Sequence, residues 1–167
     1  VVVRRTKFEL EKALKRAHIL EGLLKANGVE NFAVATLEEA VSLREDGIEG
    51  NIVILGLTPA ECVDTVIEYD LTPCVMHYDY VKALSDEAEA QGADPVKVLF
   101  GLDTGMGRVG FRVLTEEERA HAVEQYKKFA ALPGIEIAGV ITHFSTADED
   151  LQGGFDGIGI QFNVPND

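Results

Sequence analysis

Hydrophobic and polar positions follow two alternating patterns along the chain. Short runs rich in Val, Ile and Phe are typical of buried strands, and apolar residues spaced by three and four are typical of amphipathic helices. The strand-like runs cover residues 1–3, 32–35, 51–55, 73–77, 96–102 and 135–142. Helical spacing is clearest over residues 8–26, and Asn27-Gly28 marks the end of that helix. Strands alternating with helices predict parallel β/α units.

Local signals fix the starts of two further helices. The sequences TLEE at 36–39 and TEEE at 115–118 fit the capping box, in which a hydroxyl and a carboxylate satisfy free backbone donors. These units span residues 1–150, and the pattern alone fits either a doubly wound sheet or a barrel. Residues 151–167 contain four glycines and no amphipathic helix, so they form a tail in which GIGIQF is a candidate further strand.

Composition narrows the class of protein. The chain has 167 residues, 46% of them hydrophobic, which is enough for one domain with a sizeable core. Its formal net charge of -14 disfavours nucleic acid and anionic membrane surfaces as partners. The two cysteines are interpreted as reduced thiols in a cytoplasmic protein. The sequence contains no Cys/His cluster of the kind that binds a metal. No apolar run is long enough to span a bilayer, and the start at Val1 suggests a processed, excerpted or engineered chain.

The stretch GMGRVG at 105–110 matches the glycine pattern of a dinucleotide-binding loop. That loop requires a helix directly after its last glycine and an acid at the end of the next strand. Here residues 111–114 separate the glycines from the helix start at Thr115, and the next strand ends in Ile141-Thr142-His143. The glycines are therefore interpreted as a tight turn at the carboxyl end of a strand.

Five segments carry a resemblance to a known family. They are FAVATLEEAVSLREDGI (32–48), ILGLTP (54–59), EYDLTP (68–73), LDTGMGRVGFR (102–112) and PGIEIAGVITHFSTADE (133–149). In this order they resemble the amino-terminal domain of alanine racemase. The resemblance implies a TIM-type (β/α)8 barrel, here incomplete with about six units, that binds pyridoxal phosphate. It also implies a homodimer that interconverts L- and D-alanine and so supplies D-alanine for bacterial cell walls.

The resemblance assigns two cofactor-binding residues. Arg108 occupies the position of the arginine that reaches the phenolic oxygen of the cofactor and the substrate carboxylate. His143 occupies the position of the histidine that lies against the cofactor ring. The structural alternatives are a surface ion pair for Arg108 and an ordinary strand-end histidine for His143.

The chain departs from the family at its catalytic lysine. Family members carry, at the end of the first strand, a lysine that forms an imine with the cofactor. Here that strand is followed by Arg4, whose guanidinium is not a nucleophile, and Lys25 lies too close to the second strand. Lys7 is the remaining catalytic candidate, with a solvated charge as its alternative. Gly101 stands where many members carry a carbamylated lysine.

These patterns together predict an alanine racemase-like domain that acts on alanine with pyridoxal phosphate. We expect cofactor binding to be weak or absent and this chain alone to be inactive or a fragment, because the lysine and the carboxyl-terminal tyrosine of the family are not found. The alternative is a non-catalytic β/α scaffold, or a designed or recombined barrel fragment, whose open strand edges associate with another copy.

Overall fold

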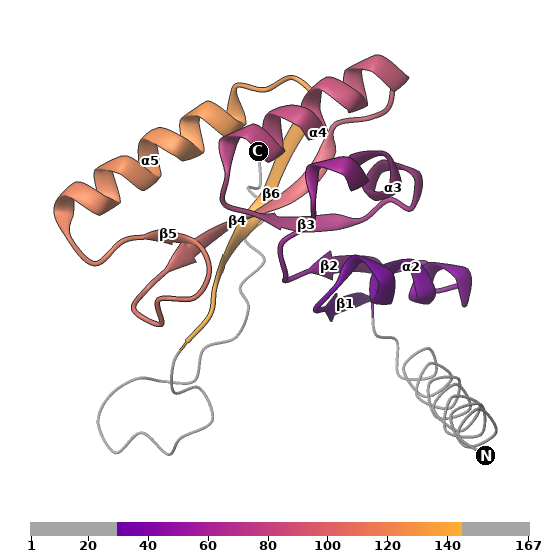
Figure 1. Ribbon diagram of the computed structural model, residues 1–167, viewed down its shortest axis with the longest axis horizontal. Coiled ribbons are helices and arrows are strands. Elements are labelled where there is room, and N and C mark those ends of the chain that lie inside the picture. The colour runs from indigo at the N-terminus through magenta and orange to yellow at the C-terminus, as the bar shows by residue number, and fades with distance from the viewer. Residues whose placement is uncertain (1–29, 145–167) are drawn as a thin grey trace, which may run out of the picture.

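One six-stranded sheet and the helices that cover it make up the computed structural model, which describes residues 30–144 (Figure 1). In chain order the elements are β1 (Asn31–Val34), α2 (Leu37–Glu45), β2 (Asn51–Ile54), the short 3-10 helix η1 (Ala60–Cys62), α3 (Val63–Glu68), β3 (Thr72–Val75), α4 (Tyr78–Gln91), β4 (Val96–Asp103), β5 (Phe111–Arg112), α5 (Glu116–Ala130) and β6 (Ile135–Thr142). The strand predicted at 1–3, the helix predicted at 8–26 and the tail 151–167 lie outside the described residues.

All strand pairs in the sheet are parallel. The order is β1-β2-β3-β4-β5, and β6 also pairs with β4. Along β6 the register runs from Val96 opposite Ile135 to Leu102 opposite Thr142, with one irregularity between Val98 and Leu99. Because the strands are parallel, the loops that follow them all lie at the carboxyl-terminal end of the sheet.

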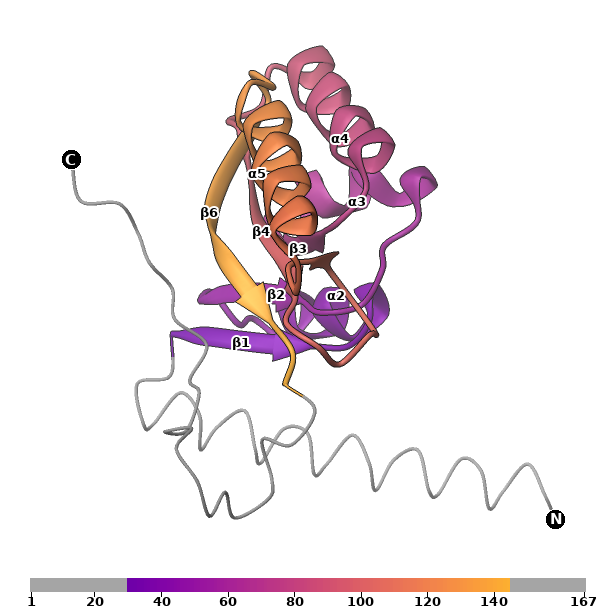
Figure 2. The ribbon, with the colours of Figure 1, turned by 90° about the vertical axis from the view of Figure 1, so that its left-hand side faces the viewer.

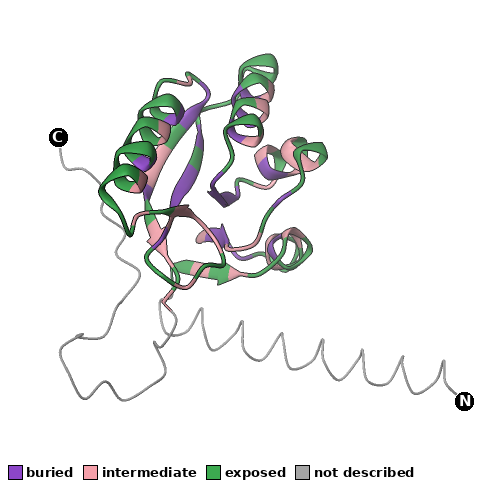
Figure 3. Ribbon diagram, turned by 60° about the vertical axis from the view of Figure 1, so that its left-hand side comes forward, coloured by how far each residue is buried: buried purple, intermediate pink, exposed green. Residues whose placement is uncertain are grey.

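The helices lie on one face of this sheet. In Figure 2, α4 and α5 run side by side against β4 and β6, and Figure 3 shows α2, α3, α4 and α5 on the outer side of the strands. Every residue of β3 is buried. The prediction of parallel β/α units is confirmed for the described residues.

The predicted helix starts are confirmed by side-chain contacts. Thr36 Oγ1 accepts a hydrogen bond from the Glu39 amide, and the Glu39 carboxylate accepts one from the Thr36 amide. Thr115 and Glu118 form the same reciprocal pair at the start of α5. Each capping residue stabilises its helix by about 1 kcal/mol.

The bounds of β1, β2 and β3 differ from the predicted ranges by one or two residues, and two further details of the strands also differ from the prediction. Asp103 is the last residue of β4, one position beyond the predicted end. The segment after the glycine loop contains β5, which the sequence pattern missed. Phe111 and Arg112 pair with Leu102 and Asp103, so this short strand depends on β4 beside it and not on local propensity.

At the amino-terminal end of the strands, Arg44 joins the loop between α2 and β2 to the loop between α3 and β3. Its guanidinium donates hydrogen bonds to the carbonyl oxygens of Ile48, Gly50, Tyr69 and Asp70, at 2.6 to 2.8 Å. The Arg44 side chain is only 13% exposed. We expect Arg44→Ala to lower the free energy of unfolding by about 2–3 kcal/mol, because it leaves partly buried carbonyls without a donor. Urea denaturation followed by circular dichroism measures this change.

Arg119→Ala is a matched control for this prediction. Arg119 also donates to two carbonyl oxygens, those of Val113 and Leu114, but it is exposed, so water replaces its contacts. We expect a change of no more than about 0.5 kcal/mol. Equal losses in the two variants would contradict the role assigned to Arg44.

Candidate active site

A cavity of about 440 Å³ lies at the carboxyl ends of the strands. Residues in or directly after five strands line it, together with the glycine loop: Ala35, Leu55, Gly56, Cys74, Gly101, Leu102, Arg108, Val109, Ile141, Thr142, His143 and Phe144. Most of these side chains are apolar or absent, and the charged or ionisable groups are Arg108, His143 and Cys74. In parallel β/α folds, ligands bind at the carboxyl ends of the strands.

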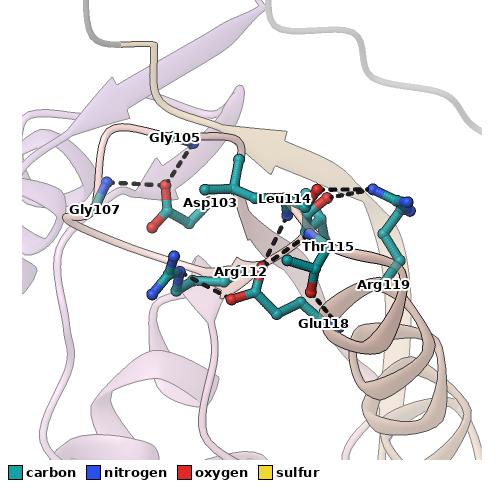
Figure 4. Close-up of polar contacts among 9 residues, drawn as sticks. Asp103, Gly105, Gly107, Arg112, Leu114, Thr115, Glu118 and Arg119 are labelled. Atoms are coloured by element: carbon teal, nitrogen blue, oxygen red, sulfur yellow. Dashed lines mark hydrogen bonds and ion pairs between the residues drawn. The ribbon is translucent and has the colours of Figure 1, made fainter.

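The glycine loop is held by the carboxylate of Asp103. Asp103 Oδ1 accepts hydrogen bonds from the backbone amides of Gly105 and Gly107, both at 2.9 Å (Figure 4). These two amides hold the pKa of Asp103 below its ordinary value, the Gly107 amide most strongly; burial opposes this and the charge of Arg112 adds to it. Asp103 is therefore a buried anion at neutral pH, with partners that favour its charge.

The glycines of this loop are required by its backbone. Gly105, Gly107 and Gly110 all have positive φ, at 132°, 71° and 102°. At Gly110 the chain also returns to β4, so that a Cβ there would lie 2.5 Å from the Leu102 carbonyl carbon. These conformations fit a tight turn, and the loop is followed by β5 where a dinucleotide loop requires a helix.

The loop brings Arg108 to His143, which follows β6. Arg108 Nη2 lies 2.7 Å from His143 Nε2. A guanidinium can only donate, so His143 Nε2 is the accepting nitrogen in this contact. A second contact joins the same two loops, with 2.9 Å between the hydroxyl oxygens of Thr104 and Thr142. Both Arg108 and His143 are exposed at the cavity mouth and accessible to a ligand.

Small residues form the floor of the cavity. A Cβ at Gly101 would lie 3.2 Å from Cys74 Sγ, so the thiol fills the space beside this glycine. Burial raises the pKa of the Cys74 thiol to about 11. Cys74 is thus protonated at neutral pH and is not an activated nucleophile. Among residues 30–144, no lysine lines this cavity.

The two predicted cofactor-binding residues, Arg108 and His143, are therefore neighbours, although 35 positions separate them in the chain. Lys7 and Arg4 lie outside the described residues. Sequence reasoning gave Asp103 no role; the signal was an aspartate followed by glycines two and four positions later, which is typical of a side chain that accepts from its own turn.

Two other kinds of site are not found in the described part of the chain. Within residues 30–144, no group of three or more His, Cys, Asp or Glu side chains is placed to hold a metal ion. Over the same residues, no helix is both long and apolar enough to cross a membrane.

Parallel β/α units with polar side chains at the carboxyl ends of the strands define the class of β/α domains that bind ligands at this end of the sheet. The family model for the alanine racemase N-terminal domain matches residues 11–157, and the chain belongs to this family. An alanine racemase of Clostridium kluyveri is 42% identical over 127 residues, covering 76% of this chain and 31% of that protein. Alanine racemase 1 of Clostridium acetobutylicum is 44% identical over the same length, with the same coverage.

Solved structures of related proteins share the fold. Alanine racemase of Clostridium difficile 630 matches with a TM-score of 0.71 and 32% identity, over 80% of this chain and 35% of that one. A histidine racemase from Leuconostoc mesenteroides matches with a TM-score of 0.65 and 28% identity, over 76% of this chain and 32% of that one. The prediction of TIM-type barrel units is confirmed. The chain spans about a third of the length of these relatives.

Proposed function

We propose that this chain forms part of the pyridoxal phosphate-binding barrel of an amino-acid racemase that acts on alanine. The observation that carries the proposal is the Arg108–His143 pair, 2.7 Å apart at the mouth of the cavity. The Clostridium kluyveri and Clostridium acetobutylicum relatives named above are alanine racemases, and they match over 127 residues of this chain. The proposal extends to a homodimer that supplies D-alanine for the cell wall.

The cavity fits the ring of such a cofactor. Gly56 and Gly101 leave its floor without side chains, and a Cβ at Gly56 would lie only 2.3 Å from the Ala35 carbonyl oxygen. A flat aromatic ring can rest on this surface, with Arg108 and His143 at its edge. Pyridoxal phosphate withdraws electrons from an attached amino acid and so makes its Cα proton removable.

Each residue of the pair has a separate task in this proposal. Arg108 donates to an anionic oxygen of the cofactor or of the substrate carboxylate, for which a permanently charged guanidinium is well suited. His143 accepts from Arg108 Nη2 and so orients the remaining donors toward the cavity. Lys7 is the proposed source of the amine that holds the cofactor and moves the Cα proton, from its position after the first predicted strand.

A non-catalytic scaffold is the second candidate, and the sheet edges favour it. Within the described residues, β1 pairs only with β2, and β6 pairs only with β4. Each strand therefore has one edge that can pair with another segment or with a second copy.

Borohydride trapping separates the two candidates. The chain is incubated with pyridoxal phosphate, reduced with borohydride to fix any lysine-bound cofactor as a stable amine, and mapped by peptide mass spectrometry. We expect saturable modification at Lys7, absent in Lys7→Ala and unchanged in Lys97→Ala, which removes an exposed lysine on β4. We also expect cofactor affinity to fall about tenfold in Arg108→Ala, the effect of losing one charged hydrogen bond.

Two results would favour the scaffold. Modification spread equally over Lys7, Lys97 and other lysines would show that labelling is nonspecific. Cofactor binding unaffected by Arg108→Ala would show that the cavity is not the binding site.

A further inference from the structure

We propose that Asp103 is a positioning residue that aims Arg108 into the cavity. It acts through the backbone of the glycine loop and not through a direct ion pair. This inference rests on the proposed function, because it concerns the same site.

The first step is the placement of the carboxylate. Asp103 is 5% exposed and ends β4, whose pairing with β5 and β6 fixes its backbone. One oxygen, Oδ1, accepts from both Gly105 and Gly107, so it gathers the first half of the loop against a rigid strand. Charged acceptors form stronger hydrogen bonds than neutral ones, and this suits a loop made of flexible glycines.

The second step is the position of Arg108 between two anchors. Gly107, held by Asp103, directly precedes it in the chain, and Gly110, packed on Leu102, follows two residues later. The space around Gly107 is open, with no atom within 4 Å of a Cβ there, so packing does not hold this part of the loop. The hydrogen bond to Asp103 therefore carries most of the constraint on the backbone before Arg108.

The third step concerns charge. The described residues include no ion pair between Asp103 and Arg108, and the other nearby arginine, Arg112, lies 3.3 Å from a Glu118 oxygen (Figure 4). A carboxylate bound directly to the Arg108 guanidinium would compete with an anionic ligand for its donors. By binding amides, Asp103 fixes the loop and leaves Arg108 free to donate to His143 and to a ligand.

The test compares Asp103→Ala, Asp103→Asn and Arg108→Ala with the double variant Asp103→Ala/Arg108→Ala, in the full chain. Asp94→Ala, which removes an exposed aspartate in the loop before β4, is the matched control. Amide hydrogen exchange of Gly105 and Gly107 and the ¹⁵N shift of His143 Nε2 are measured by NMR. Affinity for pyridoxal phosphate is measured by absorbance titration.

In Asp103→Ala we expect at least about tenfold faster exchange at Gly105 and Gly107, since each loses a charged acceptor, and unchanged exchange at Gly139 in β6. The His143 Nε2 shift should move toward that of a free ring, and cofactor affinity should fall about tenfold. In the Arg108→Ala background, Asp103→Ala should weaken affinity no further, because Asp103 acts through Arg108. Asp103→Asn keeps an acceptor oxygen. It should therefore restore most of the exchange protection, the His143 shift and the cofactor affinity that Asp103→Ala loses.

Additive losses of affinity in the double variant would overturn the proposal, as would an unchanged His143 shift in Asp103→Ala. If the unsubstituted chain binds no pyridoxal phosphate, the proposed function fails. The exchange rates and the His143 shift then still decide whether Asp103 positions Arg108.

Discussion

We expect Phe100→Ala to lower the free energy of unfolding by about 3–5 kcal/mol, as is typical when a large buried ring is removed. Phe100 lies on β4, is 2% exposed and is the centre of an aromatic cluster. Its ring stacks on Phe111 at 5.0 Å between centroids and meets Tyr126 and Phe129 edge-on, both at 5.4 Å. The substitution therefore leaves a cavity where the sheet meets α5, and urea denaturation measures its cost.

Tyr126→Ala is the matched control within the same cluster. Tyr126 contacts the Phe100 ring but is 38% exposed, so part of its surface is already in water. Hydrophobic stabilisation scales with the area removed from water, so we expect its loss to be less than half of that for Phe100→Ala. Equal losses, or a loss below about 1 kcal/mol in Phe100→Ala, would mean that the core is centred elsewhere.

The regular part of the fold could be predicted because its signals are local. β-branched runs marked β1, β2, β3, β4 and β6, and the hydroxyl–carboxylate pairs at Thr36 and Thr115 marked two helix starts. The strand β5 has only two residues and depends on pairing with Leu102 and on the stacking of Phe111 against Phe100. Such long-range contacts leave no periodic pattern. For the same reason periodicity did not separate a barrel from a doubly wound sheet, and the resemblance did.

Only those residues of the candidate site that belong to a recognisable sequence motif could be predicted. Arg108 and His143 were identified from two motifs of the resemblance, and the parallel topology explains why loops after β4 and β6 meet. The packing of Cys74 beside Gly101 could not be predicted, because residues on different strands become neighbours only in the folded sheet. The sequence analysis did not predict that Asp103 accepts hydrogen bonds from two backbone amides of the glycine loop.

We expect Gly110→Ala to lower the free energy of unfolding by about 3 kcal/mol and to weaken cofactor binding through the displacement of Arg108. The added Cβ would lie 2.5 Å from the Leu102 carbonyl carbon and 2.8 Å from the Asp103 nitrogen, both backbone atoms of β4. Overpacking against atoms that cannot rotate away costs about 1–3 kcal/mol, and a side chain at φ of 102° adds about 1–2 kcal/mol. Urea denaturation and titration with pyridoxal phosphate measure the two effects.

Two other glycines separate steric contact from backbone strain. Gly107 lies in the same loop and Gly92 ends α4; both have positive φ, at 71° and 63°, and neither has an atom within 4 Å of an added Cβ. Alanine at either position should therefore cost only about 1 kcal/mol. If all three variants lost the same stability, strain alone would explain the glycines. A larger loss at Gly110 instead requires the close packing of the loop on β4, because that contact is the feature that Gly107 and Gly92 lack.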